Sequence, residues 1–513
     1  MKRAIIIMTL LLFALQVSAQ HDMGGMDMEH SHKKAVKKTS PKPVTDTTSA
    51  KQKNEMKGDM GGMDMGDTNR KNGNGIPPKS ITDTVSSKQR NDMKSDMVGM
   101  DMGSSTAKPM IMDGMSSAYS LNLPMARNGS GTAWVPDASP MYGIMLHSGK
   151  WMLMFHGDIF PRYNKQDIFN SGKRGGQLFD APDMLMAMGQ RKVGGKGLFH
   201  FSVMLSTDAL ITGGNGYPLL FQTGESWKGK PLVDRQHPHD LFSELSVSYA
   251  YAFNKKTDVF VYVGYPGEPA LGPVTFMHRP SGMFMPDAPI GHHWEDATHI
   301  TFGVATIGAR YGKFKIEGSS FTGREPDENR YNFDHPLFDS RSARLSFNPN
   351  SNWALQVSTG YIKSPEQLQP NENIYRTTAS ATYVHPFSSA KYIAATALWG
   401  QNQVTGQDVS TAALVEGTLK LNKLALYIRY EWVQKSVEEL TLDPAIYGAK
   451  GTMIPINVVT IGAGYDLFFI GPIIVAGGAQ LSAYQAAERL KNLYGDHPVS
   501  GEIYLHLYPH IMK

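Results

Sequence analysis

TAALVEGTLKLNKLALYIRYEWV, residues 411–433, is the stretch that decides the fold. Apolar and polar side chains alternate along it on both sides of the central pair Asn422 and Lys423. A period of two is typical of a β-strand, so the stretch predicts two strands joined by a two-residue turn. Each arm has about ten residues, and a tilted strand needs roughly 9–11 residues to cross a bilayer.

The two faces of this predicted hairpin differ in chemistry. One face of the second arm ends in aromatic side chains, as the interface belt of a membrane barrel does, and carries Leu424, Leu426, Ile428, Tyr430 and Trp432. The opposite face of the hairpin carries the charged residues Glu416, Lys420, Arg429 and Glu431, which suit a wet interior. A soluble β-protein with one solvated face would show the same alternation, so the connectors have to distinguish the two folds.

Strand-like segments recur along the chain from about residue 142. The predicted strands are 150–157, 183–192, 197–206, 242–253, 257–264, 298–311, 313–322, 340–348, 352–361, 374–385, 391–400, 411–421, 423–433, 454–466, 471–483 and 500–508. Short turns such as 254–256 alternate with long loops such as 265–297, and both ends lie on the short-turn side. This pattern predicts an all-β fold, a transmembrane outer-membrane β-barrel of about 16 antiparallel strands over residues 142–513. A large soluble β-protein is the alternative.

The N-terminal residues 1–19 have the pattern of a signal peptide. Lys2 and Arg3 precede a short apolar run, and Ala19 ends a small-residue cleavage site. The chain has no cysteine, which excludes disulfides and thiolate metal sites. A formal net charge of +4 on 513 residues gives no reason to expect nucleic acid as a partner.

Residues 20–141 are predicted to form a disordered tail, because most of this segment lacks the aromatic and branched apolar residues of a core. The tail contains a repeat: DMGGMDM occupies 22–28 and 59–65, and DMVGMDM occupies 96–102, with a spacing of 37 residues. A duplicated segment without a core is more typical of repeated copies of one ligand-binding peptide than of a stacked repeat fold.

The repeated peptides are predicted to bind copper. Thioethers are soft ligands that favour Cu(I), and neighbouring imidazoles add ligands for Cu(II). The candidate ligands in the tail are Met23, Met26, Met28, His30, His32, Met60, Met63, Met65, Met97, Met100 and Met102. The alternative is a low-complexity spacer, for which methionine is an unusual choice because it is apolar and easily oxidised.

Three long connectors contain unusual residues: DRQHPHD at 234–240, FMHRPSGMFMPDAPIGHHWEDATH at 276–299 and GREPDENRYNFDHPLFD at 323–339. We choose His278, His293 and His299 as candidate metal ligands, with support from Glu295 or Asp296. Adjacent histidines on a strand point to opposite sides, so only one of the pair at 292–293 is expected to join a cluster. The loops would stand at the outer mouth of the barrel or fold into the lumen. The alternative to a metal site is that they fold inward as a structural plug whose polar residues satisfy one another. The inward strand methionines Met152, Met154, Met184, Met186 and Met188 are interpreted as packing.

These connectors resemble an uncharacterised family of bacterial outer-membrane proteins associated with heavy-metal resistance. The matching segments are GYPLLFQTGE at 216–225, DRQHPHDLF at 234–242, GEPALGPVTFMHRPS at 267–281, GHHWEDATHITFG at 291–303, GREPDENRYNFD at 323–334 and SPEQLQP at 364–370. The tail is similar in style to the methionine-rich leader of the copper-resistance protein B family. These resemblances imply a role in metal tolerance.

Together these patterns predict a barrel in the cell outer membrane with its tail in the periplasm. The expected function is copper tolerance by sequestration or export, with lipid, metal ions and periplasmic copper-handling proteins as partners and with no enzyme activity. No HExxH, GxSxG, P-loop or GxGxxG motif is present. Two alternatives remain: a porin-like channel for another solute with a metal-buffering tail, and a metalloenzyme with its site in the loop at 276–299.

Overall fold

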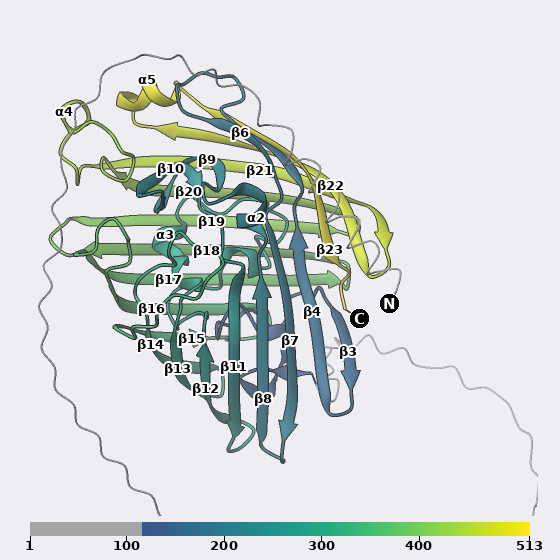
Figure 1. The fold of residues 1–513 in the computed structure, drawn as a ribbon. Helices are drawn as coiled ribbons and strands as arrows, with labels where there is room; N and C mark the ends of the chain where they lie inside the picture. The colour runs from purple at the N-terminus through teal and green to yellow at the C-terminus, as the bar shows by residue number, and fades with distance from the viewer. Residues whose placement is uncertain (1–114, 513) are drawn as a thin grey trace, which may run out of the picture. The chain divides into compact units, whose positions relative to one another are not determined.

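The computed structural model describes residues 115–512, which form a closed antiparallel β-barrel of 16 strands (Figure 1). The signal segment 1–19 and all the candidate tail ligands, from Met23 to Met102, lie outside the described residues. None of the described helices is long and apolar enough to cross a membrane. The closed barrel of 16 antiparallel strands confirms the fold class that the alternating strands and connectors predicted.

The first two crossings of the barrel are each broken into two segments, β4–β5 and β6–β7. The wall consists of β4 (Trp151–Ile159), β5 (Arg162–Gln166), β6 (Gly176–Asp180), β7 (Asp183–Val193), β8 (Gly197–Leu205), β11 (Phe242–Ala252), β12 (Thr257–Gly264), β13 (Val304–Tyr311), β14 (Phe314–Phe321), β15 (Ser340–Phe347), β16 (Trp353–Lys363), β17 (Asn373–Ser388), β18 (Lys391–Val404), β19 (Val409–Leu421), β20 (Leu424–Ser436), β21 (Met453–Ile470), β22 (Ile473–Ala486) and β23 (Val499–Pro509). The barrel closes where β23 pairs with β5.

Shorter elements lie in the connectors and before the first crossing. They are β1 (Ser116–Ser117), β2 (Ser120–Pro124), η1 (Met125–Arg127), β3 (Ile144–Ser148), α2 (Asp208–Thr212), β9 (Tyr217–Trp227), β10 (Lys230–Gln236), η2 (Phe276–His278), α3 (His292–Glu295), η3 (Ala297–His299), α4 (Pro444–Tyr447), η4 (Glu488–Leu490) and α5 (Lys491–Tyr494). The strand predicted at 298–311 begins only at Val304, because η3 occupies its first residues.

The hairpin predicted at 411–433 is present as β19 and β20. Leu421 pairs with Leu424 across the two-residue turn, where Asn422 adopts a φ of 55°. Glu416 and Arg429 face the lumen and are 1% and 2% exposed. The predicted apolar and polar faces are therefore the lipid and lumen faces of the wall.

The outer surface of the barrel is apolar. Exposed branched side chains occur on β12–β16 and on β18–β23, at Val261, Ile307, Ile316, Leu345, Val357, Ile393, Val415, Ile428, Ile461, Leu481 and Ile503. Exposed aromatic residues lie toward the short-turn end at Phe253, Tyr311, Phe314, Phe387 and Phe468, and toward the long-loop end at Tyr265, Tyr375 and Tyr430. An apolar band between aromatic girdles is the surface that a barrel presents to a lipid bilayer.

Three segments fill the interior of this barrel: residues 115–142, the connector 206–241 and the connector 265–303. Nearly all of residues 265–303 are buried, and α3 packs against β17, β18 and β19 (Figure 1). The connectors therefore fold into the lumen, one of the two arrangements that the sequence left open. Residues 115–141, placed in the tail from sequence, are among the described residues and include β1, β2 and η1.

Buried ion pairs connect the connector 265–303 to the wall. Arg279 donates to Glu416 of β19 at 2.8 Å and to Asp296 of the connector at 2.9 Å. Glu416 also accepts from Arg429 of β20 at 2.9 Å. Because a buried charge without a partner is costly, these contacts hold the connector in one position.

Candidate metal centre

Five buried histidines from two connectors come together inside the barrel. His237 and His239 follow β10, His292 and His293 belong to α3, and His299 ends η3. Neighbouring imidazole centroids around this five-histidine cluster are 5.1–6.1 Å apart. The two connectors are far apart in sequence, and only their inward folding makes them neighbours.

Four of the five imidazoles are oriented through their Nδ1 atoms. The Nδ1 contacts are His237 to Glu225 at 3.0 Å, His239 to Asp208 at 2.7 Å, His292 to Asp296 at 2.5 Å, His299 to the Asp296 carbonyl at 2.9 Å and, more loosely, His293 to Glu325 at 3.6 Å. None of the five Nε2 atoms has a hydrogen-bond partner among the described residues, although all five are buried. A carboxylate or carbonyl on one ring nitrogen with the other nitrogen free is the arrangement of metal-binding histidines.

The wall and the neighbouring connectors hold these histidines in place. The carbonyl oxygen of His293 accepts from Arg376 at 2.6 Å and from Asn402 at 2.9 Å, so β17 and β18 fix the backbone of α3. Trp294 donates its indole N–H to Ser410 of β19 at 2.8 Å. The side chains on α3 are therefore positioned by three barrel strands.

His293 also belongs to a second group of candidate ligands, whose ligand atoms lie close together. Its imidazole and the carboxylates of Glu325 and Glu366 place three ligand atoms within 4.8 Å of one another, and this is the one such set among the described residues. The other imidazoles are spaced too widely to join it around a single ion without moving. His293 thus links the five-histidine cluster to a carboxylate pair.

The carboxylate pair lines a cavity of about 640 Å³ formed mainly by the long connectors. Its acidic lining residues are Glu225, Glu325, Glu366, Glu372, Asp408, Glu438, Glu439 and Asp443, and its basic ones are Arg376 and Lys450. A cavity lined mostly by one sign of charge concentrates ions of the opposite sign. The lining of this cavity would therefore favour cations over anions.

Burial and neighbouring charges set the protonation of the centre. Burial lowers the pKa of His292 to about 4 and the pKa of His293 and of His299 well below the usual value, so these imidazoles are neutral at pH 7. Burial and the Glu225 carboxylate raise the pKa of Glu325 to about 7, and burial and Glu325 raise the pKa of Glu366. A cation bound between these carboxylates would relieve their repulsion.

The structure places the predicted ligands in two groups. His293 and His299 belong to the five-histidine cluster, whereas His278 lies apart from it with its ring 5.7 Å from that of His156. His292 and His293 both lie on the helical turn α3 with ring centroids 5.3 Å apart, whereas on a strand they would point to opposite sides. Only His293 belongs to the set with Glu325 and Glu366, so a single histidine of the pair joins that set. The ligands chosen from the sequence did not include His237, His239 or His292, although the paired histidines of DRQHPHD were a signal for the first two.

Asp296 supports the cluster, and Glu295 does not. Asp296 contacts His292 through its carboxylate and His299 through its carbonyl oxygen. Both carboxyl oxygens of Glu295 are buried without a described hydrogen-bond partner, and burial raises the pKa of Glu295 well above its usual value. Of the two supporting residues suggested by the sequence, only Asp296 has that role.

A buried carboxyl near the centre predicts a pH effect on stability. Burial raises the pKa of Glu268 from its ordinary value of 4.5 to about 8. Its contribution to stability is therefore full below pH 4.5 and is lost as the pH rises through 8. We expect Glu268→Gln to be more stable, relative to the unchanged protein, at pH 9 than at pH 5. The measurement is the urea midpoint of each protein in detergent at both pH values. The same difference at both pH values would contradict this.

No protein-family model matches this sequence, and no curated protein matches it. Three solved structures of related shape are outer-membrane proteins. OmpF of Salmonella typhi in complex with daunomycin has a TM-score of 0.43 and 9% identity, and the match covers 71% of this chain and 99% of that one. An anion-selective porin from Comamonas acidovorans has a TM-score of 0.42 and 10% identity, with 70% and 99% covered. The outer-membrane channel DcaP of Acinetobacter baumannii has a TM-score of 0.38 and 10% identity, with 72% and 99% covered. At these TM-scores the likeness carries no conclusion about what this barrel binds, which has to be argued from its own residues.

Proposed function

We propose that this protein is an outer-membrane barrel that holds transition-metal cations, copper in first place, within its lumen and acts in copper tolerance by sequestration or export. The observation that carries this proposal is the five-histidine cluster, in which four Nδ1 atoms contact a carboxylate or carbonyl oxygen closely and none of the five Nε2 atoms has a hydrogen-bond partner among the described residues. Imidazole suits copper, zinc and nickel. Neutral imidazole is the form that binds metal, and burial favours it at His292, His293 and His299.

The acidic cavity supports a cation as cargo. It adjoins His293, so an ion attracted by the carboxylates would reach an imidazole directly. The connectors that fill the lumen favour a small ion over a large solute, which makes the porin-like alternative weaker. The methionine peptides of the tail would collect Cu(I) by thioether ligation and exchange it with periplasmic copper-handling proteins.

The test compares metal content in the full mature chain. The variant His292→Ala/His293→Ala/His299→Ala is expected to bind roughly one ion fewer per chain when loaded with Cu(II) or Zn(II), because too few imidazoles remain for a four-coordinate site. The tail is identical in both proteins, so any metal that it binds contributes equally to both metal contents. Metal per chain is measured by elemental analysis after removal of weakly bound ions.

A matched control removes three exposed histidines, His147, His335 and His385, by the same change to alanine. This control is expected to retain all of the metal. Equal metal content in the unchanged protein and the cluster variant would overturn the proposal. A single zinc ion that does not exchange with free metal would instead support the metalloenzyme alternative.

A further inference from the structure

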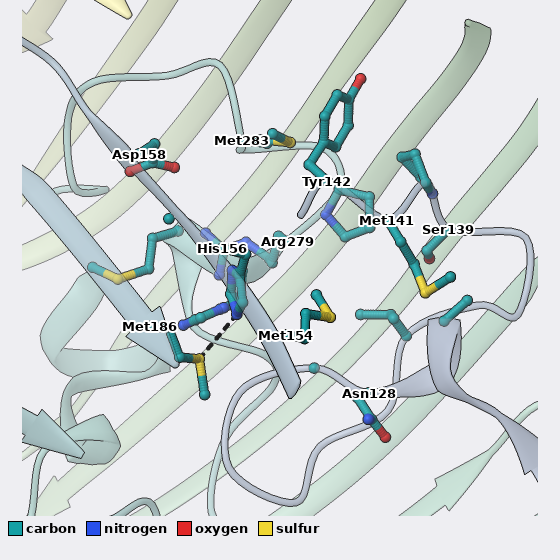
Figure 2. A pocket seen from close by; sticks show the side chains of 18 of the residues that line it. Asn128, Ser139, Met141, Tyr142, Met154, His156, Asp158, Met186, Arg279 and Met283 are labelled. Atoms are coloured by element: carbon teal, nitrogen blue, oxygen red, sulfur yellow. Dashed lines mark hydrogen bonds between the residues drawn. The ribbon is translucent and has the colours of Figure 1, made fainter. Parts of the chain in front are cut away.

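A second cavity in the lumen has a lining rich in methionine. It has a volume of about 140 Å³, and eight methionines and two histidines line it. Figure 2 shows Met141, Met154, Met186 and Met283 around this methionine pocket, together with His156. The lining comes from the segment before the first crossing, from the wall strands β4 and β7, and from η2 with the residues that follow it.

Ordinary packing does not account for this composition. Two clusters of the core, one around Met125, Met152 and Met154 and one around Met184, Met186 and Met204, consist entirely of methionine, including the partly buried hydrophobic side chains packed against them. The three largest clusters of the core instead use leucine, isoleucine, valine and aromatic residues, with methionine in only one of them. Because methionine is flexible and defines a packed core poorly, its concentration at one place points to its sulfur atoms.

Imidazoles stand among these sulfur atoms. The Nε2 atom of His156 lies 3.0 Å from the sulfur of Met186, and the rings of His156 and His278 are 5.7 Å apart. The charge of Arg279, which also borders the methionine pocket, is already paired with Glu416 and Asp296. The pocket therefore offers sulfur and imidazole donors, and the carboxyl group of Asp158 also lines it.

We infer that the methionine pocket is a Cu(I) site, and an Ag(I) site by the same chemistry, in which Met154, Met186, His156 and His278 are the ligands. Thioethers are soft donors that select Cu(I) over divalent cations, and imidazole completes the set. The site uses none of the five histidines that carry the proposed function, so the two can be tested independently of each other.

The methionine pocket and the five-histidine cluster are contiguous. A small cavity is bordered by both His239 and Met277, and another is bordered by both His299 and His278. The thioether donors of the methionine pocket thus lie next to the imidazole donors of the five-histidine cluster. This placement would let the barrel hold copper as Cu(I) in one place and as a divalent ion in the next.

The experiment loads the full mature chain with Ag(I), an air-stable probe for Cu(I) sites. The variant Met154→Leu/Met186→Leu keeps the bulk of the side chains and removes two sulfur atoms. It is expected to bind roughly one Ag(I) fewer per chain than the unchanged protein, because soft thioether ligands are lost. The control Met145→Leu/Met152→Leu changes two methionines of the same region that do not line the pocket, and it should bind as much Ag(I) as the unchanged protein.

Two further outcomes separate this inference from the proposed function. The His292→Ala/His293→Ala/His299→Ala variant should keep the Ag(I) that the leucine variant loses, and the leucine variant should keep its Zn(II). Heat-dependent migration on gels verifies that each variant is a folded barrel. Equal Ag(I) content in the unchanged protein and the leucine variant would overturn the inference, as would an equal loss in the control.

Discussion

Replacing Arg279 by methionine is expected to lower the free energy of unfolding by about 3–5 kcal/mol, because it removes the cation that two buried carboxylates share. The guanidinium is 1% exposed and bridges Glu416 of the wall to Asp296 of the connector. Arg429 and His292 remain as partners of the two carboxylates, but neither reaches from one carboxylate to the other. The measurement is urea unfolding in detergent, followed by tryptophan fluorescence.

The same change is expected to weaken metal binding. Asp296 orients both His292 and His299, so a shift of this carboxylate misaligns two imidazoles. The control Lys450→Met breaks an exposed ion pair with Glu438, and such pairs contribute about 0–1 kcal/mol. A stability loss for Arg279→Met no larger than that of the control would show that the connector is held by other contacts.

Gly400→Ala is expected to displace α3 from the wall and to cost about 1–3 kcal/mol of stability, in the range measured for overpacked cores. A methyl group at this position would lie 2.3 Å from the carbonyl oxygen of Trp294. Backbone cannot move aside as a flexible side chain does, so the helical turn that carries His292 and His293 must shift. The bound metal should fall together with stability, measured on the same samples.

The matched control for this substitution is Gly417→Ala on the lipid face of β19. The nearest atom to its new methyl group is the Ala394 carbonyl oxygen at 3.5 Å, an ordinary contact. Its stability and metal content should equal those of the unchanged protein. If Gly400→Ala behaves in the same way, the close contact between α3 and β18 does not determine the geometry of the metal centre.

The wall of the barrel was predictable from local patterns. Val415 and Ile428 face lipid while Glu416 and Arg429 face the lumen, as the period-two alternation predicted. This works because a strand sends successive side chains to opposite faces whatever it pairs with. Loop lengths added the alternation of short and long connections, which distinguishes a membrane barrel from a sandwich.

The candidate metal centre was only partly predictable. The sequence identified His293 and His299, but it separated them from His237 and His239, which lie in another connector. It also assigned His278 to the same site, although η2 directs that residue to the methionine pocket. Which connectors meet depends on how each one folds into the lumen, and contacts of that range leave no periodic signal in the chain.

The sequence by itself determined the strands, their lipid and lumen faces and the presence of many soft and borderline metal ligands. Only the tertiary structure decided which ligands become neighbours. His292 and His293 show the reason: a strand would turn them apart, whereas the close packing of α3 against Gly400 holds them on one helical turn in the same cluster. That choice between strand and helix is made by the surrounding wall, because four residues are too few to form a stable helix alone.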